Sequence, residues 1–192
     1  MVFFKKGWLV LGSFFLAGLV LIGAYLLLDH VFVRQIGFAT FPAMTAEEQI
    51  EKAHLIVKGT FEDKSKAFRF SSSNFTDYDL TVEEVYRGDA AAGDVLSVRV
   101  EEGLVGTLWV ETVHEPKIRL GDTVFVYLYQ TGGDYYYVLN GKSGYYLFDG
   151  EGKIKNSESG EVLGLAEVED TIKKVYEREQ KSKENSANSL SK

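Results

Sequence analysis

"TVFVYLYQTGGDYYYVLNGKSGYYLFDGEGKI", residues Thr123–Ile154, decides the fold class of this chain and holds seven of its eleven tyrosines. Three pairs of turn-forming residues divide it into short apolar runs, and such pairs are typical of β-hairpins. The pairs are Gly132-Gly133, Asn140-Gly141 and Asp149-Gly150. The stretch therefore predicts two or more antiparallel hairpins.

The apolar runs of this stretch are hydrophobic on both faces, because side chains alternate between the faces of a strand. Val124, Val126 and Leu128 share one face and Phe125, Tyr127 and Tyr129 the other, and in the next run Tyr135, Tyr137 and Leu139 oppose Tyr136 and Val138. Such strands suit a central or helix-covered position. We interpret the tyrosines as the walls of a small barrel. The alternative is a ligand-stacking platform. Its candidate ligand-facing aromatics are Tyr127, Tyr129, Tyr135 and Tyr137.

The residues before this stretch continue the β pattern. Residues 55–61 alternate in the manner of a strand, and Gly59 interrupts them, which commonly marks a bulge or a sharp bend. Tyr78, Leu80 and Val82 share one face of a further strand, as do Leu96, Val98 and Val100 of the next, and "GTLWVETV" is a shorter candidate. The chain therefore predicts a mainly β domain.

Two helices are expected at the ends of this domain. Thr45 and Glu48 form a capping box that predicts a short helix from Ala46 to about Ala53. Leu165, Val168, Ile172, Val175 and Tyr176 recur at helical spacing. This spacing predicts an amphipathic helix that packs on the barrel. Residues 181–192 are polar and rich in Ser and Asn, which predicts a disordered tail.

The N-terminal segment carries no charge over 22 residues, Gly7–Leu28, which meets the roughly 20 residues needed to cross a bilayer. We expect a transmembrane helix there, so the lipid bilayer is a predicted partner. Lys5 and Lys6 predict that residues 1–6 are cytoplasmic and that the C-terminal domain lies outside. Residues 29–44 then form a connector. The alternative is a cleaved signal peptide and a secreted domain, although the apolar run exceeds the usual length of about 7–15 residues.

The order of short helix, bent first strand, further strands and closing helix resembles the OB-fold. It is similar to the tissue-inhibitor-of-metalloproteinase-like (netrin-like) version found in membrane-anchored bacterial envelope proteins. The resemblance rests on "AHLIVKGTF" (Ala53–Phe61), "YDLTVEEVYRGD" (Tyr78–Asp89), "GDVLSVRV" (Gly93–Val100) and "LGDTVFVYLY" (Leu120–Tyr129). It implies a five- to seven-stranded OB-like barrel over residues 45–180. The animal inhibitors of that superfamily chelate a protease zinc ion through an N-terminal cysteine, which this chain lacks, so that activity is not implied here.

Composition excludes several classes of function. The formal charge of −7 and the pI of about 5.1 disfavour generic nucleic-acid binding, which needs clustered Lys and Arg. The chain has no cysteine, which excludes disulfides, thiolate zinc sites and a cysteine nucleophile. "NFT" at Asn74–Thr76 is a glycosylation sequon, meaningful only in a eukaryotic secretory context.

Few residues of the chain suit catalysis or metal binding. The three histidines are His30, His54 and His114. His114, between Glu111 and Glu115, is the best metal candidate, but no second histidine lies at ligand spacing, which favours a solvated loop. Glu101, Glu102 and Glu111 could bind calcium weakly, without the ligand spacing of an established loop. We therefore predict no catalytic, cofactor-binding or metal-binding residue.

Two functional hypotheses remain. The favoured one is a non-enzymatic binding module in the cell membrane, whose partner is an unknown extracytoplasmic protein or envelope component. The other is an envelope hydrolase or glycan-processing accessory enzyme that uses carboxylates such as Asp134 and Asp149. A converging pocket with a carboxylate of perturbed pKa would favour the enzyme, and its absence would favour the module.

Overall fold

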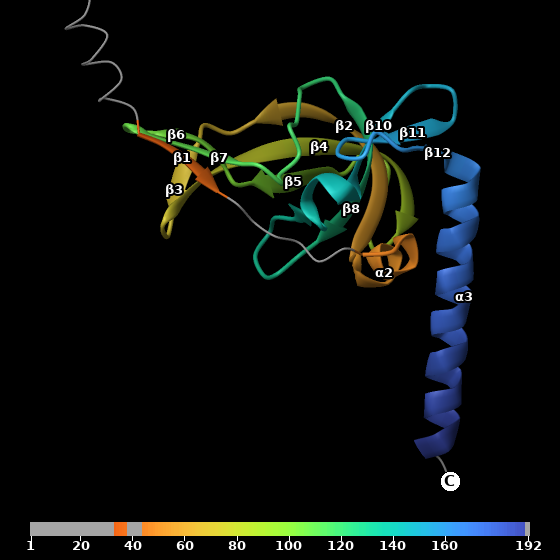
Figure 1. Ribbon diagram of the computed structural model, residues 1–192. Helices are drawn as coiled ribbons and strands as arrows, with labels where there is room; N and C mark the ends of the chain where they lie inside the picture. The colour runs from red at the N-terminus through yellow and green to blue at the C-terminus, as the bar shows by residue number, and fades with distance from the viewer. Residues whose placement is uncertain (1–32, 38–43, 191–192) are drawn as a thin grey trace, which may run out of the picture.

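The computed structural model describes residues 33–37 and 44–190 and is shown in Figure 1. The predicted cytoplasmic N-terminus and transmembrane segment, residues 1–28, lie outside the described residues. Within the described part of the chain, no helix is long and apolar enough to cross a membrane. The described residues form a mainly β structure with a long C-terminal helix, as the sequence predicts.

The main sheet has nine strands in the order β12-β11-β10-β8-β2-β4-β3, with β5 paired to β4 and β9 paired to β8. Their bounds are β2 Leu55–Lys64, β3 Phe68–Phe70, β4 Ser73–Arg87, β5 Val95–Val100, β8 Thr123–Tyr129, β9 Tyr137–Val138, β10 Tyr145–Phe148, β11 Lys153–Asn156 and β12 Val162–Gly164. A smaller sheet has the order β1-β7-β6. Its strands are β1 Val33–Gly37, β6 Glu102–Val105 and β7 Leu108–Thr112.

The predicted closed barrel of five to seven strands is not found among the described residues: the main sheet runs from β12 to β3, with β5 and β9 paired to it as side branches. The chain after β8 forms the short strands β10, β11 and β12, which extend the sheet beyond β8. The segment with three consecutive tyrosines yields only the two-residue strand β9. One bridge joins Val98 of β5 to Tyr136, with backbone hydrogen bonds of 2.7 Å from Arg99 to Tyr136 and 2.8 Å from Tyr136 to Ser97.

Strand β2 bends where the sequence predicts. Its pairing with β4 shifts register between Lys58 and Gly59, with further shifts on either side. A Cβ atom at Gly59 would collide with the backbone oxygen of Thr81 on β4. The glycine is therefore required by the close approach of two backbones, and the predicted bulge is confirmed.

Two hydrophobic cores lie on opposite faces of strands β2 and β8. Val124, Val126 and Leu128 belong to the first core, with Leu55, Val57, Phe61, Tyr78, Leu80, Val82, Val98, Val100, Val138 and Tyr145. Phe125 and Tyr127 belong to the second, with Ile50, Ala53, Ile56, Leu139, Tyr146, Ile154, Val168, Ile172 and Val175. The predicted alternation of β8 is confirmed. Both faces of β8 are apolar because each packs in a core: one face in the first core, and the other in the second core, which the helices cover.

The helices that cover the second core are α2, Ala46–Lys52, and α3, Leu165–Leu190. The capping box of Thr45 and Glu48 starts α2 as predicted. Val168, Ile172 and Val175 of α3 are buried, whereas Tyr176 is exposed. Figure 1 shows that α3 continues well past the rest of the domain. The helix assignment extends to Leu190 and so includes residues 181–190, for which the sequence predicts a disordered tail.

The predicted connector, residues 29–44, contains a strand. Residues Val33–Gly37 form β1 and pair with β7 in parallel, so Gly37 lies beside Thr112. The folded domain therefore includes residues before the predicted start at Thr45. A short 3-10 helix, η1 Gly141–Gly144, completes the described elements between β9 and β10.

Candidate functional site

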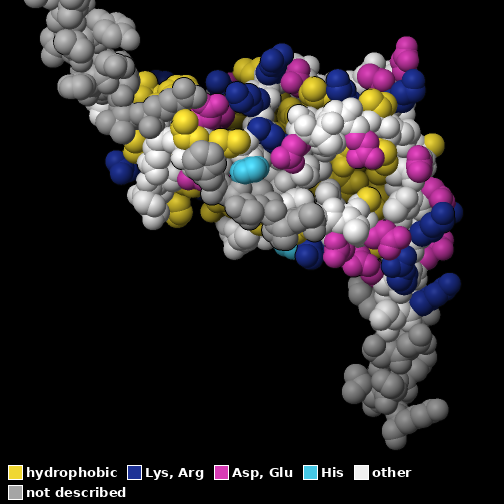
Figure 2. Space-filling view, viewed as in Figure 1, with side chains coloured by type: hydrophobic (Ala, Val, Ile, Leu, Met, Phe, Trp, Pro, Cys, Tyr) yellow, Lys and Arg dark blue, Asp and Glu magenta, His cyan; other side chains and the backbone are white. Residues whose placement is uncertain are grey.

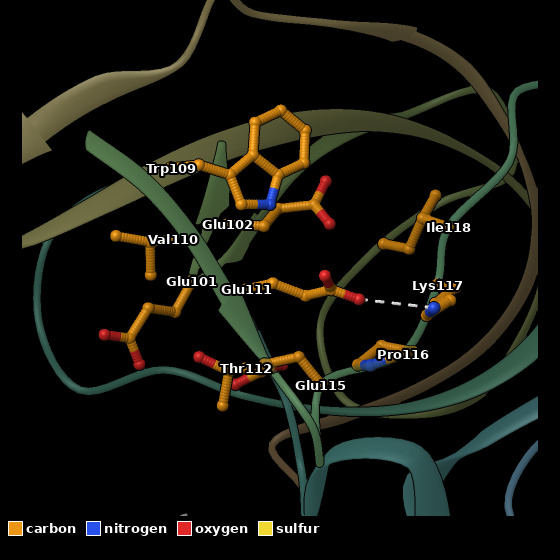
Figure 3. Close-up of a pocket in the computed structure, with 10 residues that line it drawn as sticks. All are labelled: Glu101, Glu102, Trp109, Val110, Glu111, Thr112, Glu115, Pro116, Lys117 and Ile118. Atoms are coloured by element: carbon orange, nitrogen blue, oxygen red, sulfur yellow. Dashed lines mark ion pairs between the residues drawn. The ribbon is translucent and has the colours of Figure 1, made fainter. Parts of the chain in front are cut away.

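A hollow of about 200 Å³ lies beside β7 and is lined by four glutamates. Glu101 and Glu102 come from the junction of β5 and β6, Glu111 comes from β7, and Glu115 comes from the loop that follows. Figure 3 shows the side chains of Glu102, Glu111 and Ile118 around the same space, with the Trp109 ring at its edge. We call this feature the acidic hollow.

The strand pairing brings these carboxylates together. Glu102 on β6 and Glu111 on β7 are direct cross-strand partners, a position at which like charges repel. Compensation comes from neighbours: the Tyr78 hydroxyl donates to Glu102, and Lys117 Nζ lies 3.3 Å from Glu111 Oε1. Glu101 accepts a hydrogen bond from the Ser73 hydroxyl. Lys117 is the only cationic side chain among the described residues that line the hollow.

Glu115 has the most perturbed carboxyl group of the hollow. Burial disfavours its charged form, and the charges of Glu101 and Glu102 add to this effect, so its pKa is raised to about 7. The carboxyl therefore changes its protonation near neutral pH. A cation that entered the hollow would favour the ionised form and lower this pKa.

Thr112 adds an unsatisfied polar group to the lining of the acidic hollow. Its side chain is only 5% exposed, and its hydroxyl has no hydrogen-bond partner in the described part of the chain. Buried hydroxyls in native proteins are usually paired, so an unpaired one beside a hollow is consistent with a ligand that supplies the partner.

His114, the best metal candidate in the sequence, lies near the carboxylate of Glu158. Its Nδ1 atom lies 3.9 Å from Glu158 Oε1. Among the residues that the structure describes, no group of three or more His, Asp or Glu side chains is placed to hold a metal ion. His54 has a structural contact, because its Nδ1 atom accepts a hydrogen bond of 3.0 Å from the backbone of Gln130. The four carboxylates thus surround the hollow without converging on one point.

The carboxylates proposed for the enzymatic alternative lie apart from the acidic hollow. Asp134 is exposed on the loop between β8 and β9. Asp149 accepts backbone hydrogen bonds of 2.9 Å from Glu151 and 3.1 Å from Lys153, which organise the turn between β10 and β11. Asp149 therefore has a structural role in a turn.

The four candidate ligand-facing tyrosines fall into two environments. Tyr127 is 3% exposed and lies in the second core, so it does not face a ligand. The other three form one cluster: the ring centroids of Tyr129 and Tyr137 are 5.5 Å apart, and those of Tyr135 and Tyr137 are 5.4 Å apart. These rings are partly buried.

Arg99 occupies one face of this tyrosine cluster. Its guanidinium lies 3.5 Å from the centroid of Tyr135 and forms hydrogen bonds of 2.7 and 2.8 Å with Asp77. The stacking surface is thus already used within the protein, which favours the structural interpretation of the tyrosines. The cluster is electrostatically coupled to the acidic hollow, since burial and then the Glu115 charge raise the pKa of Tyr129.

A basic hollow of about 550 Å³ shares Lys117 with the acidic hollow. Arg119, Lys142 and Lys155 line it together with Lys117. The sequence gives no local signal for this cluster or for the acidic hollow, because residues from several separate segments meet only in the folded chain. Of the residues that line the acidic hollow, Glu101, Glu102 and Glu111 are the weak calcium ligands that the sequence suggests.

A comparison of this chain with protein-family models and with curated protein sequences finds no match.

Proposed function

We propose that this is a single-pass membrane protein that presents a non-enzymatic binding domain outside the cytoplasm, and that the acidic hollow receives a cationic group of its ligand. The anchor is supported by the uncharged segment Gly7–Leu28, and the orientation by Lys5 and Lys6. The ligand belongs to an extracytoplasmic protein or envelope component. No role in nucleic-acid binding is proposed, given the net charge of −7.

We assign the domain to the OB-like group, in its tissue-inhibitor-of-metalloproteinase-like form. Two features support this assignment. Strand β2 follows a short helix and bends at Gly59, as a first strand shared between two parts of a sheet should. The bridge between Val98 and Tyr136 brings β5 against the segment that leads into β9.

One observation carries the proposed binding role: four glutamates surround one hollow, and a single lysine among its described lining residues offsets their charge. Carboxylates gathered around one hollow favour a cation that enters between them. The exposed ring of Trp109 at the edge can add a cation–π contact to an ammonium or guanidinium group.

The size of the hollow supports binding of a single group in preference to catalysis on a whole substrate. Sites for small molecules are usually about 300–1,000 Å³, and the acidic hollow has a volume of about 200 Å³. An amine or guanidinium at the end of a chain fits such a space, whereas a sugar ring with its neighbours needs more.

Titration of the full chain in detergent micelles with trilysine and with triglutamate tests this proposal. We expect trilysine to bind and triglutamate to remain unbound. The double substitution Glu111→Gln with Glu115→Gln should abolish trilysine binding. The pair Glu151→Gln with Glu161→Gln, which removes the same charge from exposed residues outside the hollow, should preserve it. Equal loss in both variants would show only a general charge effect and would contradict the proposal.

The membrane topology has its own test. Protease added to intact cells should remove the C-terminal domain and leave the N-terminal segment in the membrane. Full protection of the domain would overturn the orientation. Release of a mature domain into the medium would favour the secreted alternative.

One observation favours a hydrolase as a second candidate. The raised pKa of Glu115 lets this carboxyl donate a proton at neutral pH, as a general acid must, and other carboxylates lie nearby. Release of reducing ends from an envelope glycan, lost in Glu115→Gln and retained in Asp134→Asn, would favour the enzyme over the module.

A further inference from the structure

The outer face of the small sheet carries exposed apolar side chains around the acidic hollow. Leu104 and Trp109 are direct cross-strand partners, and Ile36 pairs with Glu111, two residues after Trp109. Because side chains alternate along a strand, Ile36, Leu104 and Trp109 share one face. They are 45%, 40% and 42% exposed. We call these three residues the apolar rim.

The apolar rim lies at one end of the domain. Figure 1 places β1, β6 and β7 at the end opposite α3, and Figure 2 shows hydrophobic side chains gathered towards that end of the visible face. Large apolar side chains that gather on a surface mark an interaction site more often than isolated ones do.

The short stretch of chain between the proposed membrane segment and β1 limits which partners the apolar rim can contact. The proposed membrane segment ends at Leu28, and β1 begins at Val33. Five residue steps span at most roughly 17 Å when the chain is fully extended, so β1 must start close to the bilayer surface. A tryptophan beside exposed aliphatic side chains suits the interface between lipid and water.

Charges of both signs lie near Trp109. Trp109 lines the acidic hollow and also a neighbouring hollow, which Lys64 and Lys66 line together with Leu104 and which shares Glu102 with the acidic hollow. Both lysines are exposed. A phospholipid headgroup that carries an ammonium and a phosphate has the complementary arrangement, with the ammonium directed to the carboxylates and the phosphate to the lysines.

We propose that the small sheet docks on the outer surface of the membrane that anchors the protein, and that the acidic hollow receives the ammonium headgroup of a zwitterionic phospholipid while Trp109 inserts at the lipid interface. This inference rests on the proposed anchor and cation-binding role. It identifies the cationic ligand as a bilayer lipid. The buried Thr112 hydroxyl supplies a further polar group to the site, independently of the carboxylates.

Trp109 makes the inference directly measurable. The chain has two tryptophans, Trp8 and Trp109, so Trp8→Phe leaves Trp109 as the sole indole reporter. The full chain carrying Trp8→Phe is reconstituted in vesicles of phosphatidylglycerol alone and of phosphatidylethanolamine mixed equally with phosphatidylglycerol. A small fraction of the lipids carries a nitroxide at headgroup level. We expect loss of Trp109 fluorescence in both vesicles, with the greater loss in the mixed ones.

Two pairs of variants separate the contribution of the glutamates to quenching from that of the apolar rim. Glu111→Gln with Glu115→Gln should remove the extra quenching seen with phosphatidylethanolamine, and Glu151→Gln with Glu161→Gln should retain it. Leu104→Gln should reduce quenching in both kinds of vesicle, whereas Val162→Gln, at an exposed position of β12, should leave it unchanged. Because Leu104 lies outside the lining of the acidic hollow, this second pair reports docking even if the glutamate variants fold poorly.

The outcomes distinguish this inference from the proposed function. Unquenched Trp109 in protein that stays with the vesicles through an alkaline wash would overturn the docking, while trilysine binding in micelles would leave the proposed cation site standing. Equal quenching in both lipids would overturn the headgroup assignment. Emission that shifts to shorter wavelength with rising protein density but is not quenched by lipid would assign the face to a second copy of the chain and overturn the inference. Release of the protein by the wash would contradict both the proposed anchor and this inference.

Discussion

The backbone oxygen of Thr81 occupies the place that a side chain at Gly59 would need. A Cβ atom there would also lie 3.1 Å from Leu80 Cδ1, a buried core atom. Neither the β4 backbone nor this core side chain can move without disturbing the register between β2 and β4. The bend of β2 and the packing of the first core are thus fixed at the same position.

Gly59→Val should therefore destabilise the domain by roughly 1–3 kcal/mol, the usual scale for overpacking. The measurement compares urea midpoints of the fragment 33–192, which contains every helix and strand of the described structure, at equal m-value. Gly164→Val is the matched control, since nothing lies within 4 Å of a Cβ there and the backbone is not left-handed. Gly133 is unsuitable as a control because its φ is +89°. An unchanged midpoint for Gly59→Val would refute the bent-strand interpretation.

Asn74 joins the main sheet to the small one. Its side chain is fully buried, and its Nδ2 atom donates to the backbone oxygens of Leu108 at 2.8 Å and Gly103 at 3.2 Å. Asn74→Ala should cost about 1–3 kcal/mol, because two buried carbonyls lose a donor. Hydrogen exchange should accelerate at the amides of β6 and β7 and remain slow in β8. Uniform acceleration would show global destabilisation and contradict a local joint.

The same residue shows where sequence reasoning stops. "NFT" matches a glycosylation sequon, yet Asn74 and Thr76 are buried, and Thr76 Oγ1 donates to the backbone of Glu102 at 3.1 Å. The alternation of β8 and the bulge at Gly59 could be predicted, because periodicity and glycine chemistry are local signals. The role of Asn74 depends on strands that follow about 30 residues later in the chain. A single sequence carries no signal for a contact between residues so far apart in the chain.

The acidic hollow illustrates the same limit. Glu102 and Glu111 become neighbours through the register of β6 and β7, and Glu115 joins them through the loop that follows. The glutamates that flank His114 in the sequence do not predict its neighbour in the fold, where its ring lies near Glu158. The parallel pairing of β1 with β7 has no signal in the sequence either, because a five-residue strand in a connector of mixed apolar and polar residues has too little periodicity to identify.

The ion pair between Arg87 and Glu179 should hold the middle of α3 against β4. Arg87 Nη2 lies 2.9 and 3.1 Å from the two carboxylate oxygens, and both side chains are partly buried. Glu179→Gln should lower stability by about 1–2 kcal/mol, because it leaves a partly buried guanidinium without its counterion. Asp170→Asn, which breaks an exposed pair with Lys174 on the same helix, should leave the urea midpoint unchanged. If both substitutions lowered the urea midpoint equally, burial of the Arg87–Glu179 pair would not explain its contribution to stability.

Glu115 should make the stability of the domain depend on pH in the range in which its carboxyl titrates. Its pKa rises from 4.5 to about 7 on folding, so the folded state favours the protonated form. The stabilisation is complete below pH 4.5 and is lost as the pH rises through about 7. Glu115→Gln cannot ionise, so its advantage over the unmodified chain should be near zero at pH 4 and about 1–3 kcal/mol at pH 8.

The difference between Glu115→Gln and the unmodified chain isolates this carboxyl from all other groups that titrate. Urea midpoints of the fragment 33–192 should converge at low pH and separate above neutrality, whereas Glu151→Gln should follow the unmodified chain throughout. Saturating trilysine should reduce the separation at pH 8, because a bound cation offsets the cost of ionising Glu115. A pH-independent difference would mean that the substitution acts through packing, and it would remove the electrostatic basis of the acidic hollow.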